Sequence, residues 1–284
     1  IVLMLLAVLV VGEITLGAQS RFDLGFFSLQ PSDPAKVILI LVLAKYFAKR
    51  HELIGDFRHI IVSGIYAFLI FGIVFIQPDF GSAVILFFVW LGMVLVSGIK
   101  IQHLITVFLL GAIAFGGMWQ FVFLDYQKER IATFLNPLSD IQGAGYNAYQ
   151  STVAIGSGEL LGRGIGYGSQ SKLLFLPEYE TDFIFAAFAE EWGMIGVILL
   201  FGLFTIVIHR LLRHAAEGAT NFERLFTAGV AILFVAHFFV HIGMNIGLLP
   251  VTGTTVPFLS YGGSHLLTEF IALGIVMGMR RYKP

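Results

Sequence analysis

The feature that most constrains this chain is a series of long apolar segments separated by shorter polar connections. A helix needs about 20 mostly apolar residues to span a bilayer core about 30 Å thick. The chain is 57% hydrophobic and only 12% charged, whereas soluble domains carry about 25% charged residues. Suitable segments occupy residues 1–17, 35–47, 60–76, 82–97, 104–124, 182–209, 225–249 and 264–279. The sequence therefore predicts an all-α, polytopic membrane protein with about eight transmembrane helices.

We expect residues 1–284 to form one integral membrane domain. The chain begins inside an apolar run, IVLMLLAVLVV, without an initiator methionine or a basic leader. This start is typical of a membrane helix with further sequence upstream rather than of a signal peptide. The shortest segment, residues 35–47, contains Lys36 and Lys45 near its ends. Their long side chains could snorkel to opposite faces of the membrane.

The distribution of positive charge predicts the orientation of the chain. If the first segment runs outward, the short cytoplasmic connections carry ten of the 17 lysine and arginine residues. The opposite side carries six over many more residues, and the positive-inside rule therefore favours this arrangement. The longest polar connection, residues 124–181, then forms a large extracytoplasmic loop, in which residues 146–155 could form a short helix on the surface. A second irregular stretch, residues 249–264, lies on the same outer side and is rich in proline and glycine. A long loop held by a rigid scaffold is a common place for binding and chemistry.

An unusual concentration of carboxylates lies where this loop meets the sixth apolar segment. A carboxylate at the middle of a membrane helix costs roughly 2.5 to 3.5 kcal/mol, so such a concentration indicates a function. We predict Thr181 as the N-cap of a helix, with Asp182 in its first turn. Asp182 could complement the helix dipole or act as a general base whose pKa is tuned by its surroundings. The carboxylates within residues 177–193 are Glu178, Glu180, Asp182, Glu190 and Glu191.

The cations of the same outer side also allow two interpretations. They could contact lipid phosphates, or they could clamp a pyrophosphate, for which arginine is suited by its bidentate geometry. Lys36 and Asp33, which precede the second segment, could join such a clamp or pair with each other. The cations within residues 124–181 are Lys128, Arg130, Arg163 and Lys172.

Other polar residues favour simpler roles. Asp79, in the sequence QPDFG at residues 77–81, most simply caps the helix that follows it. His237 and His241 stand at i and i+4 in an apolar segment, where histidines more often pack or hydrogen-bond than bind metal. No Walker A, GxSxG or complete GxGxxG motif occurs, which disfavours an NTPase or a serine hydrolase.

Several motifs, in the same order along the chain, resemble those of the SEDS family (shape, elongation, division and sporulation proteins), which includes RodA and FtsW. The resemblance runs through nearly the whole chain. The DLG sequence at residues 23–25 and the DYQ run that begins at residue 125 are closer to the RodA branch. The matching motifs are QPSDPAK at 30–36, QPDFG at 77–81, YQKERIATFLNP at 126–137, GAGYNAYQSTVAIGSG at 143–158, PEYETDFIF at 177–185 and MNIGLLPVTG at 244–253, followed by PFLSYGGS at 257–264.

The resemblance implies a fold of ten membrane helices, of which the first two are absent here. It implies a peptidoglycan glycosyltransferase that polymerises lipid II into glycan strands during cell-wall elongation, with undecaprenyl pyrophosphate as leaving group. The essential aspartate of the family falls on Asp182, as general base on the acceptor GlcNAc 4-hydroxyl. The substrate-binding residues it implies are Lys36, Asp33, Asp79, Arg130, Gln150, Arg163, Glu178 and Ser260.

The same resemblance implies a divalent cation, Mg²⁺ or Mn²⁺, for which Glu178 and Asp79 are candidate ligands. It implies a class B penicillin-binding protein and other membrane proteins of the elongation complex as partners, and no nucleic acid. It places the protein in the bacterial cytoplasmic membrane, with an extracytoplasmic active face. Two other functions stay open, a lipid II flippase and an inactive scaffold of the elongation complex.

Overall fold

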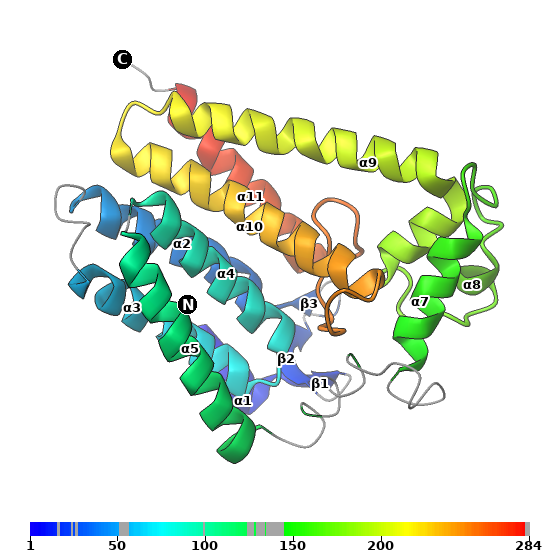
Figure 1. Cartoon of the computed structure of the whole chain (residues 1–284), viewed down its shortest axis with the longest axis horizontal. Helices are drawn as coiled ribbons and strands as arrows, with labels where there is room; N and C mark the ends of the chain where they lie inside the picture. The colour runs from blue at the N-terminus through cyan, green and yellow to red at the C-terminus, as the bar shows by residue number, and fades with distance from the viewer. Residues whose placement is uncertain are drawn as a thin grey trace. The chain divides into compact units, whose positions relative to one another are not determined.

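The structure is a computed structural model that describes residues 1–15, 18–23, 25, 28–50, 57–98, 100–123, 128, 134 and 145–281. Helices dominate these residues, as the sequence predicts (Figure 1). The chain divides into two compact units. Unit 1 contains Ile1–Ile99, Thr205–Phe238 and Pro257–Pro284, and unit 2 contains Lys100–Phe204 and Phe239–Val256.

Unit 1 starts with a helix that is shorter than the sequence predicts. Within the predicted segment at residues 1–17, the helix is α1 (Val2–Val11). An antiparallel sheet in the order β1-β2-β3 follows it. Glycine is a poor helix former, and Gly12 stands at the end of α1 in an extended conformation. The strands are β1 (Glu13–Thr15), β2 (Ala18–Asp23) and β3 (Ser28–Leu29), with Glu13 opposite Arg21 and Phe22 opposite Leu29.

Unit 1 contains further helices, and among them α10 packs against α2 and α4 through glycines. Gly229 of α10 faces Ile40 of α2 and Met93 of α4, and a Cβ on Gly92 of α4 would lie 2.6 Å from Ile232 of α10. Small residues at such contacts let helix backbones approach closely. The helices of unit 1 that follow the sheet are α2 (Ser32–Ala48), α3 (Arg58–Ile76), α4 (Phe80–Val96), α11 (Gly263–Arg281), the first part of α10 (Asn221–Asn245) and the last part of α9 (Ile184–Ala216).

Unit 2 contains the helix that the sequence predicts within the outer loop. The predicted helix at residues 146–155 is α7 (Tyr146–Ser157). It packs on the start of α9 through a small apolar core of Ala154, Leu176, Phe183 and Ala186, which are all buried. The remaining elements of the unit are α5 (Ile101–Phe121), α8 (Ser169–Lys172) and the last turns of α10.

Helix α9 is interrupted at Gly193, where the backbone has φ 64° and ψ −167°. The main chain of the preceding loop satisfies the groups that this break exposes. The amides of Arg163 and Gly164 donate to the carbonyls of Glu190 and Glu191 at 2.9 and 3.1 Å, and Met194 N–H donates to the main-chain carbonyl of Glu159 at 3.0 Å. Buried backbone groups need such partners, so residues 159–164 and the helix break form one structural element.

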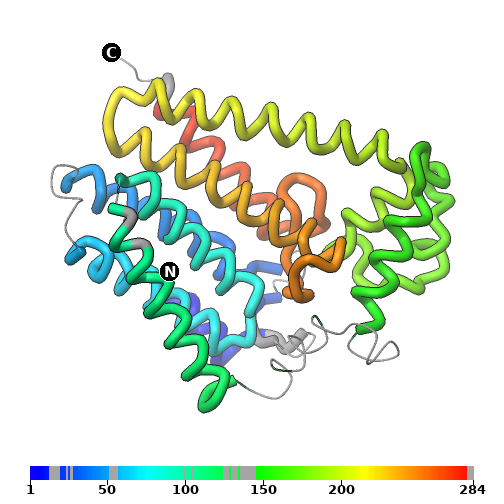
Figure 2. Tube along the Cα trace, in the orientation of Figure 1, coloured from blue at the N-terminus to red at the C-terminus, as the bar shows by residue number. Residues whose placement is uncertain are grey.

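Three helices within the described residues, α3, α9 and α10, are long and apolar enough to cross a membrane. Shorter apolar helices are α1, α4, residues 105–121 of α5 and residues 263–279 of α11. Residues 246–262, which join α10 to α11, form no strand and no α-helix (orange in Figure 2). The irregular segment that the sequence predicts at residues 249–264 is therefore confirmed up to the start of α11.

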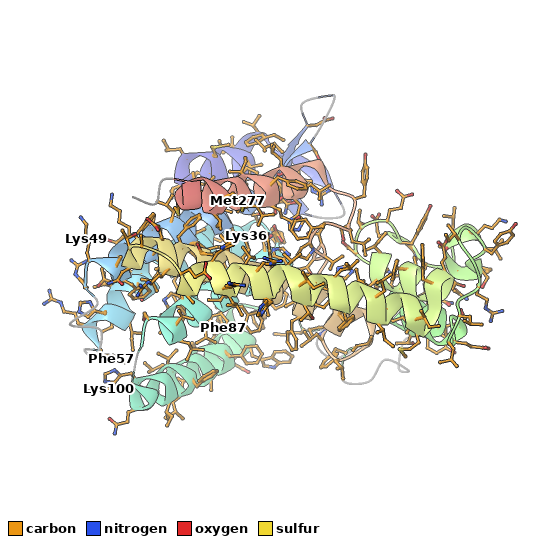
Figure 3. All side chains as sticks on the ribbon, turned by 90° about the horizontal axis from the view of Figure 1, so that it is seen from above. Lys36, Lys49, Phe57, Phe87, Lys100 and Met277 are labelled. Atoms are coloured by element: carbon orange, nitrogen blue, oxygen red, sulfur yellow. The ribbon has the colours of Figure 1, made fainter. Side chains whose placement is uncertain are left out.

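Lys36 does not snorkel to a membrane face. Its side chain is buried within unit 1 (Figure 3), where it is 3% exposed and its Nζ lies 3.0 Å from Asp33 Oδ1. The prediction of snorkelling is wrong at this position because a nearby carboxylate supplies a buried partner. Lys45, on the same helix, is exposed.

Candidate functional site

Asp182 lies in a turn immediately before α9, rather than in the first turn of the helix. The amides of Thr181 and Phe183 both donate to the carbonyl of Glu178 at 3.1 Å, which holds residues 178–183 in this turn. The Thr181 hydroxyl donates to Glu178 Oε2 at 2.9 Å. The predicted N-cap is therefore wrong, because the Thr181 side chain bonds backward along the chain. Asp182 is half-buried.

A buried asparagine holds the backbone on both sides of the start of α9. Asn245 Nδ2 donates to the Asp182 carbonyl at 3.0 Å and to the His241 carbonyl at 2.8 Å. Its Oδ1 accepts from the Ala186 amide at 3.2 Å. Ala186 N–H is one of the amides in the first turn of α9, which have no partner within the helix. Asn245 of α10 therefore accepts a hydrogen bond from the first turn of α9, which is the capping role that we predicted for Thr181.

The Asp182 carboxylate lies against a glycine of the irregular segment. A Cβ on Gly253 would stand 3.3 Å from Asp182 Oδ2, and Gly253 has φ +66°. Glycine is favoured in this backbone conformation because it has no side chain to clash. The backbone of one segment and the carboxylate of another thus meet at this position in unit 2.

The other predicted residues of unit 2 lie at exposed or half-buried positions. Glu178 is exposed, with φ +53°. Arg163 is exposed and its Nε donates to the Ser157 carbonyl at 2.9 Å. Gln150 is half-buried on α7, and Arg130 lies outside the described residues. Beside Glu178, the Tyr179 hydroxyl donates a hydrogen bond to Glu180 Oε1 at 3.1 Å, and this bond raises the pKa of Tyr179.

Glu190 is completely buried, and its carboxylate organises the loop that precedes α9. Its Oε1 accepts from the Ser169 hydroxyl at 3.0 Å, from the Gln170 amide at 3.1 Å and from the Ser157 hydroxyl at 3.3 Å. Glu191, by contrast, is half-buried. The two neighbouring glutamates of α9 therefore have different surroundings. Glu190 links α7, α8 and α9.

Unit 1 contains a second polar cluster, which is buried among its helices. Asp33 Oδ1 lies 3.0 Å from Lys36 Nζ and 3.7 Å from His265 Nδ1. His265 Nε2 lies 2.9 Å from Glu269 Oε1, and Glu269 Oε2 accepts from the Phe258 amide at 3.1 Å. Of the alternatives for Asp33 and Lys36, the structure contains the pair. Sequence reasoning missed His265 and Glu269, although an acid four residues after a histidine in an apolar segment is a detectable signal.

The two other histidines of interest pack or hydrogen-bond. The ring of His237 lies 4.7 Å from that of His265, centroid to centroid. His241 Nδ1 lies 2.6 Å from the Thr254 carbonyl, which can only accept. Both histidines are buried. Their positions agree with the interpretation that favoured packing over metal binding.

Asp79 caps α4, as the sequence predicts. Its Oδ1 accepts from the Ser82 amide at 3.0 Å, and its Oδ2 accepts from Gln30 Nε2 at 2.8 Å and from the Ser32 hydroxyl at 3.1 Å. These contacts fasten the segment before α2 to the start of α4. Ser260, also in unit 1, is buried.

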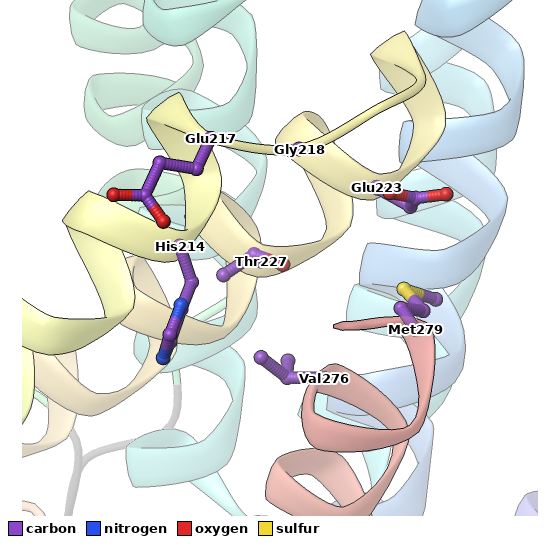
Figure 4. A pocket seen from close by; sticks show the side chains of 7 residues that line it. All are labelled: His214, Glu217, Gly218, Glu223, Thr227, Val276 and Met279. Atoms are coloured by element: carbon purple, nitrogen blue, oxygen red, sulfur yellow. The ribbon is translucent and has the colours of Figure 1, made fainter. Parts of the chain in front are cut away.

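Among the described residues, no group of three or more histidine, aspartate or glutamate side chains could hold a metal ion by itself. A small cavity of about 20 Å³ lies in unit 1 where α9 turns into α10 (Figure 4). It has room for about one water molecule and contains none of the predicted site residues. Its lining residues are His214, Glu217, Gly218, Glu223, Thr227, Val276 and Met279.

Known proteins are similar to this chain in both sequence and fold. Peptidoglycan glycosyltransferase MrdB of Escherichia coli (strain K12) is 38% identical over 282 residues, which cover 99% of this chain and 76% of that protein. A chain from a peptidoglycan synthase complex that coordinates polymerization and crosslinking has a TM-score of 0.80 and 31% identity, and the match covers 100% of this chain and 80% of that one. A variant of the rod shape determining protein RodA from Thermus thermophilus has a TM-score of 0.70 and 30% identity, with 100% and 77% covered.

These similarities and the apolar helices agree with the prediction of a multi-pass membrane protein. The sequence profile of one family, described as cell cycle proteins, matches residues 1–284. The resemblance that the motifs indicated is therefore confirmed, and this chain belongs to the cell cycle protein family of FtsW, RodA and SpoVE.

Proposed function

We propose that this protein is a peptidoglycan glycosyltransferase that polymerises lipid II, with Asp182 as its general base. The observation that carries this proposal is the placement of Asp182. Its carbonyl is held by Asn245 at 3.0 Å, and its half-buried carboxylate lies beside Gly253. A carboxylate in a defined position, partly shielded from water, suits a general base. The name and the 38% identity of the Escherichia coli relative support the reaction class.

In the proposed reaction the acceptor GlcNAc 4-hydroxyl attacks the anomeric carbon of the donor sugar. The new glycosidic bond forms as the bond to the pyrophosphate oxygen breaks, and undecaprenyl pyrophosphate leaves with the bonding electrons. The hydroxyl proton passes to the Asp182 carboxylate. A single displacement inverts the configuration at the anomeric carbon. Arg163, which is exposed in the same unit, and Arg130 are the residues proposed to attend the phosphates.

A divalent cation, Mg²⁺ or Mn²⁺, would neutralise charge on the departing pyrophosphate. Protein sites for Mg²⁺ commonly supply one or two carboxylates, and water and phosphate oxygens complete the shell. Glu178 fits such a site because its carboxylate is exposed in the turn that contains Asp182. Asp79 fits less well, because both of its oxygens already accept hydrogen bonds from Gln30, Ser32 and Ser82.

The cellular setting follows from charge and from the relatives. The positive-inside rule supports a bacterial cytoplasmic membrane location with the Asp182 turn on the extracytoplasmic face. The relative in a peptidoglycan synthase complex supports a class B penicillin-binding protein as the crosslinking partner. Lys36, Asp33, Gln150 and Ser260 are further proposed substrate contacts, and other membrane proteins of the elongation complex are further proposed partners.

Transport of lipid II is a second candidate function, and one observation favours it. Asp33, Lys36, His265 and Glu269 are buried together in unit 1. Ionisable side chains inside membrane proteins often mark a path for a polar substrate. The broken helix α9 is also of a kind found in transporters.

The test is polymerisation of lipid II by the purified protein in proteoliposomes with Mg²⁺, compared with Asp182→Asn. Asp23→Asn is a matched control, because it makes the same change at an exposed residue that bonds within its own turn. We expect glycan polymer from the parent protein and from Asp23→Asn, and none from Asp182→Asn. Movement of lipid II across the bilayer is measured in the same vesicles.

Two results would count against the proposal in different ways. Full polymerisation by Asp182→Asn would remove the assignment of the base. Lipid II movement without polymer from the parent protein, with the transpeptidase partner present, would favour the transport function.

A further inference from the structure

We infer that Asn245 is a positioning residue for catalysis, which sets the location of Asp182 by binding the Asp182 carbonyl and the Ala186 amide, on either side of the start of α9. This inference rests on the proposed function of Asp182. Asn245 does not touch the reacting atoms in this scheme. It acts through the Asp182 carbonyl, to which its side-chain nitrogen donates at 3.0 Å.

Both the nitrogen and the oxygen of the Asn245 side-chain amide form hydrogen bonds. Its Nδ2 donates to the carbonyls of Asp182 and His241, and its Oδ1 accepts from the Ala186 amide. The reverse orientation of the amide would place Oδ1 against two carbonyl oxygens, so these partners determine the orientation. The residue is completely buried. Its three shortest side-chain hydrogen bonds, at 2.8 to 3.2 Å, are all to the backbone of α10 or to the start of α9.

Asparagine is suited to this position by its chemistry. The position requires a donor for the Asp182 carbonyl and an acceptor for the Ala186 amide, and a side-chain amide provides both. An ionised aspartate would accept from Ala186 and would repel the two carbonyls. A leucine of similar size would form none of these bonds. The residue type thus matches the backbone groups that surround it.

Asn245 also connects Asp182 to a third helix. The Ser151 hydroxyl of α7 donates to the Asn245 main-chain carbonyl at 2.8 Å, and it lies 3.4 Å from Asn245 Oδ1. Asn245 is the last residue of α10. The start of α9 is consequently fixed to the end of α10 and, through Ser151, to α7.

This arrangement predicts an effect on turnover rather than on binding. Displacement of a catalytic group by about 1 Å can lower a rate about 100-fold. A loss of the bond to the Asp182 carbonyl frees the turn without removing the carboxylate. Substrate contacts elsewhere in the protein stay in place, so KM for lipid II should change little.

The experiment measures kcat and KM for lipid II polymerisation by Asn245→Asp and Asn245→Leu in the full chain. Asn221→Asp, at the exposed opposite end of α10, is matched for the chemical change. Ser171→Ala removes a buried hydroxyl that bonds to a backbone carbonyl in the same unit, and it is matched for the kind of bond lost. For the two Asn245 variants we expect kcat to fall roughly 10-fold to 100-fold with KM within about 3-fold, and both controls should keep the parent kcat.

Asn245→Asp keeps the size of the side chain and its acceptor to Ala186, so it tests the inference even if Asn245→Leu does not fold. A parent-like kcat for Asn245→Asp would overturn the inference, and so would a raised KM with unchanged kcat. An equal loss of kcat in Ser171→Ala would indicate a general effect on folding and would also overturn it. Asp182→Asn in the same assay separates the two proposals: if it is inactive while Asn245→Asp is fully active, only the positioning role is wrong.

Discussion

Substitution of Gly253 by alanine should lower turnover by crowding the Asp182 carboxylate. The new Cβ would lie 3.3 Å from Asp182 Oδ2, slightly closer than the ordinary contact range that starts at 3.4 Å. The carboxylate must therefore move by a few tenths of an ångström. If a shift of about 1 Å costs about 100-fold in rate, a shift of about 0.3 Å costs roughly 4-fold. We expect kcat for lipid II polymerisation to fall roughly 3-fold to 10-fold.

The same substitution also strains the backbone, and the control must remove that effect. Gly253 has φ +66°, where a residue with a Cβ is destabilised by roughly 1–2 kcal/mol. Gly166, in the same unit, has φ +75° and no atom within 4 Å of a Cβ at its position. Gly166→Ala therefore carries a similar backbone strain without the contact to Asp182. The assay compares kcat, KM and the thermal unfolding midpoint of the two variants with those of the parent.

The two variants should lower the unfolding midpoint by similar amounts, and only Gly253→Ala should lower kcat. A parent-like kcat for Gly253→Ala would refute the contact as a constraint on the Asp182 carboxylate. Equal losses of kcat in both variants would attribute the effect to backbone strain instead.

Two further predictions concern the buried charges. Lys36→Met should destabilise the protein by about 3–5 kcal/mol, because Asp33 would be left buried without its closest cation, and the double variant with Asp33→Asn should recover much of that loss in a thermal unfolding assay in detergent. Glu190→Gln should expose the loop at residues 159–172 to limited proteolysis. The main-chain N–H of Gln170 donates to both oxygens of the carboxylate, so the amide nitrogen that replaces one of them would face this donor. Unchanged protection of that loop would show that the carboxylate does not hold it.

The parts of the structure that the sequence predicts are those set by local patterns. Apolar length predicts most of the helices, and the loop helix α7 starts at the predicted residue, Tyr146. The cap formed by Asp79 depends on residues three positions apart. The pairing of Asp33 with Lys36, which is one of the two alternatives that the sequence allows, depends on the same spacing. In both pairs the interacting residues are three positions apart and belong to one helical turn.

The parts that the sequence does not predict depend on residues that are distant in the chain. Thr181 has the residue type of an N-cap, yet Asn245, which is 59 positions away from Ala186, supplies the acceptor. The cluster of His265 and Glu269 with Asp33 likewise joins the two ends of the chain. Side-chain preferences at one position carry no information about such partners. Helix α1 ends early for a different reason, since residues 13–15 pair with β2 in a small sheet that the apolar pattern concealed.

The break in α9 connects the preceding loop to the turn that carries Asp182. An uninterrupted helix would use the carbonyls of Glu190 and Glu191 within its own ladder. Because the helix is interrupted at Gly193, those carbonyls accept from Arg163 and Gly164 instead. Asp182 stands immediately before the first segment of this helix, residues 184–192, and the loop is attached at the end of that segment. A rigid helical segment thus fixes the distance between the proposed base and Arg163, so a shift in either should be transmitted to the other.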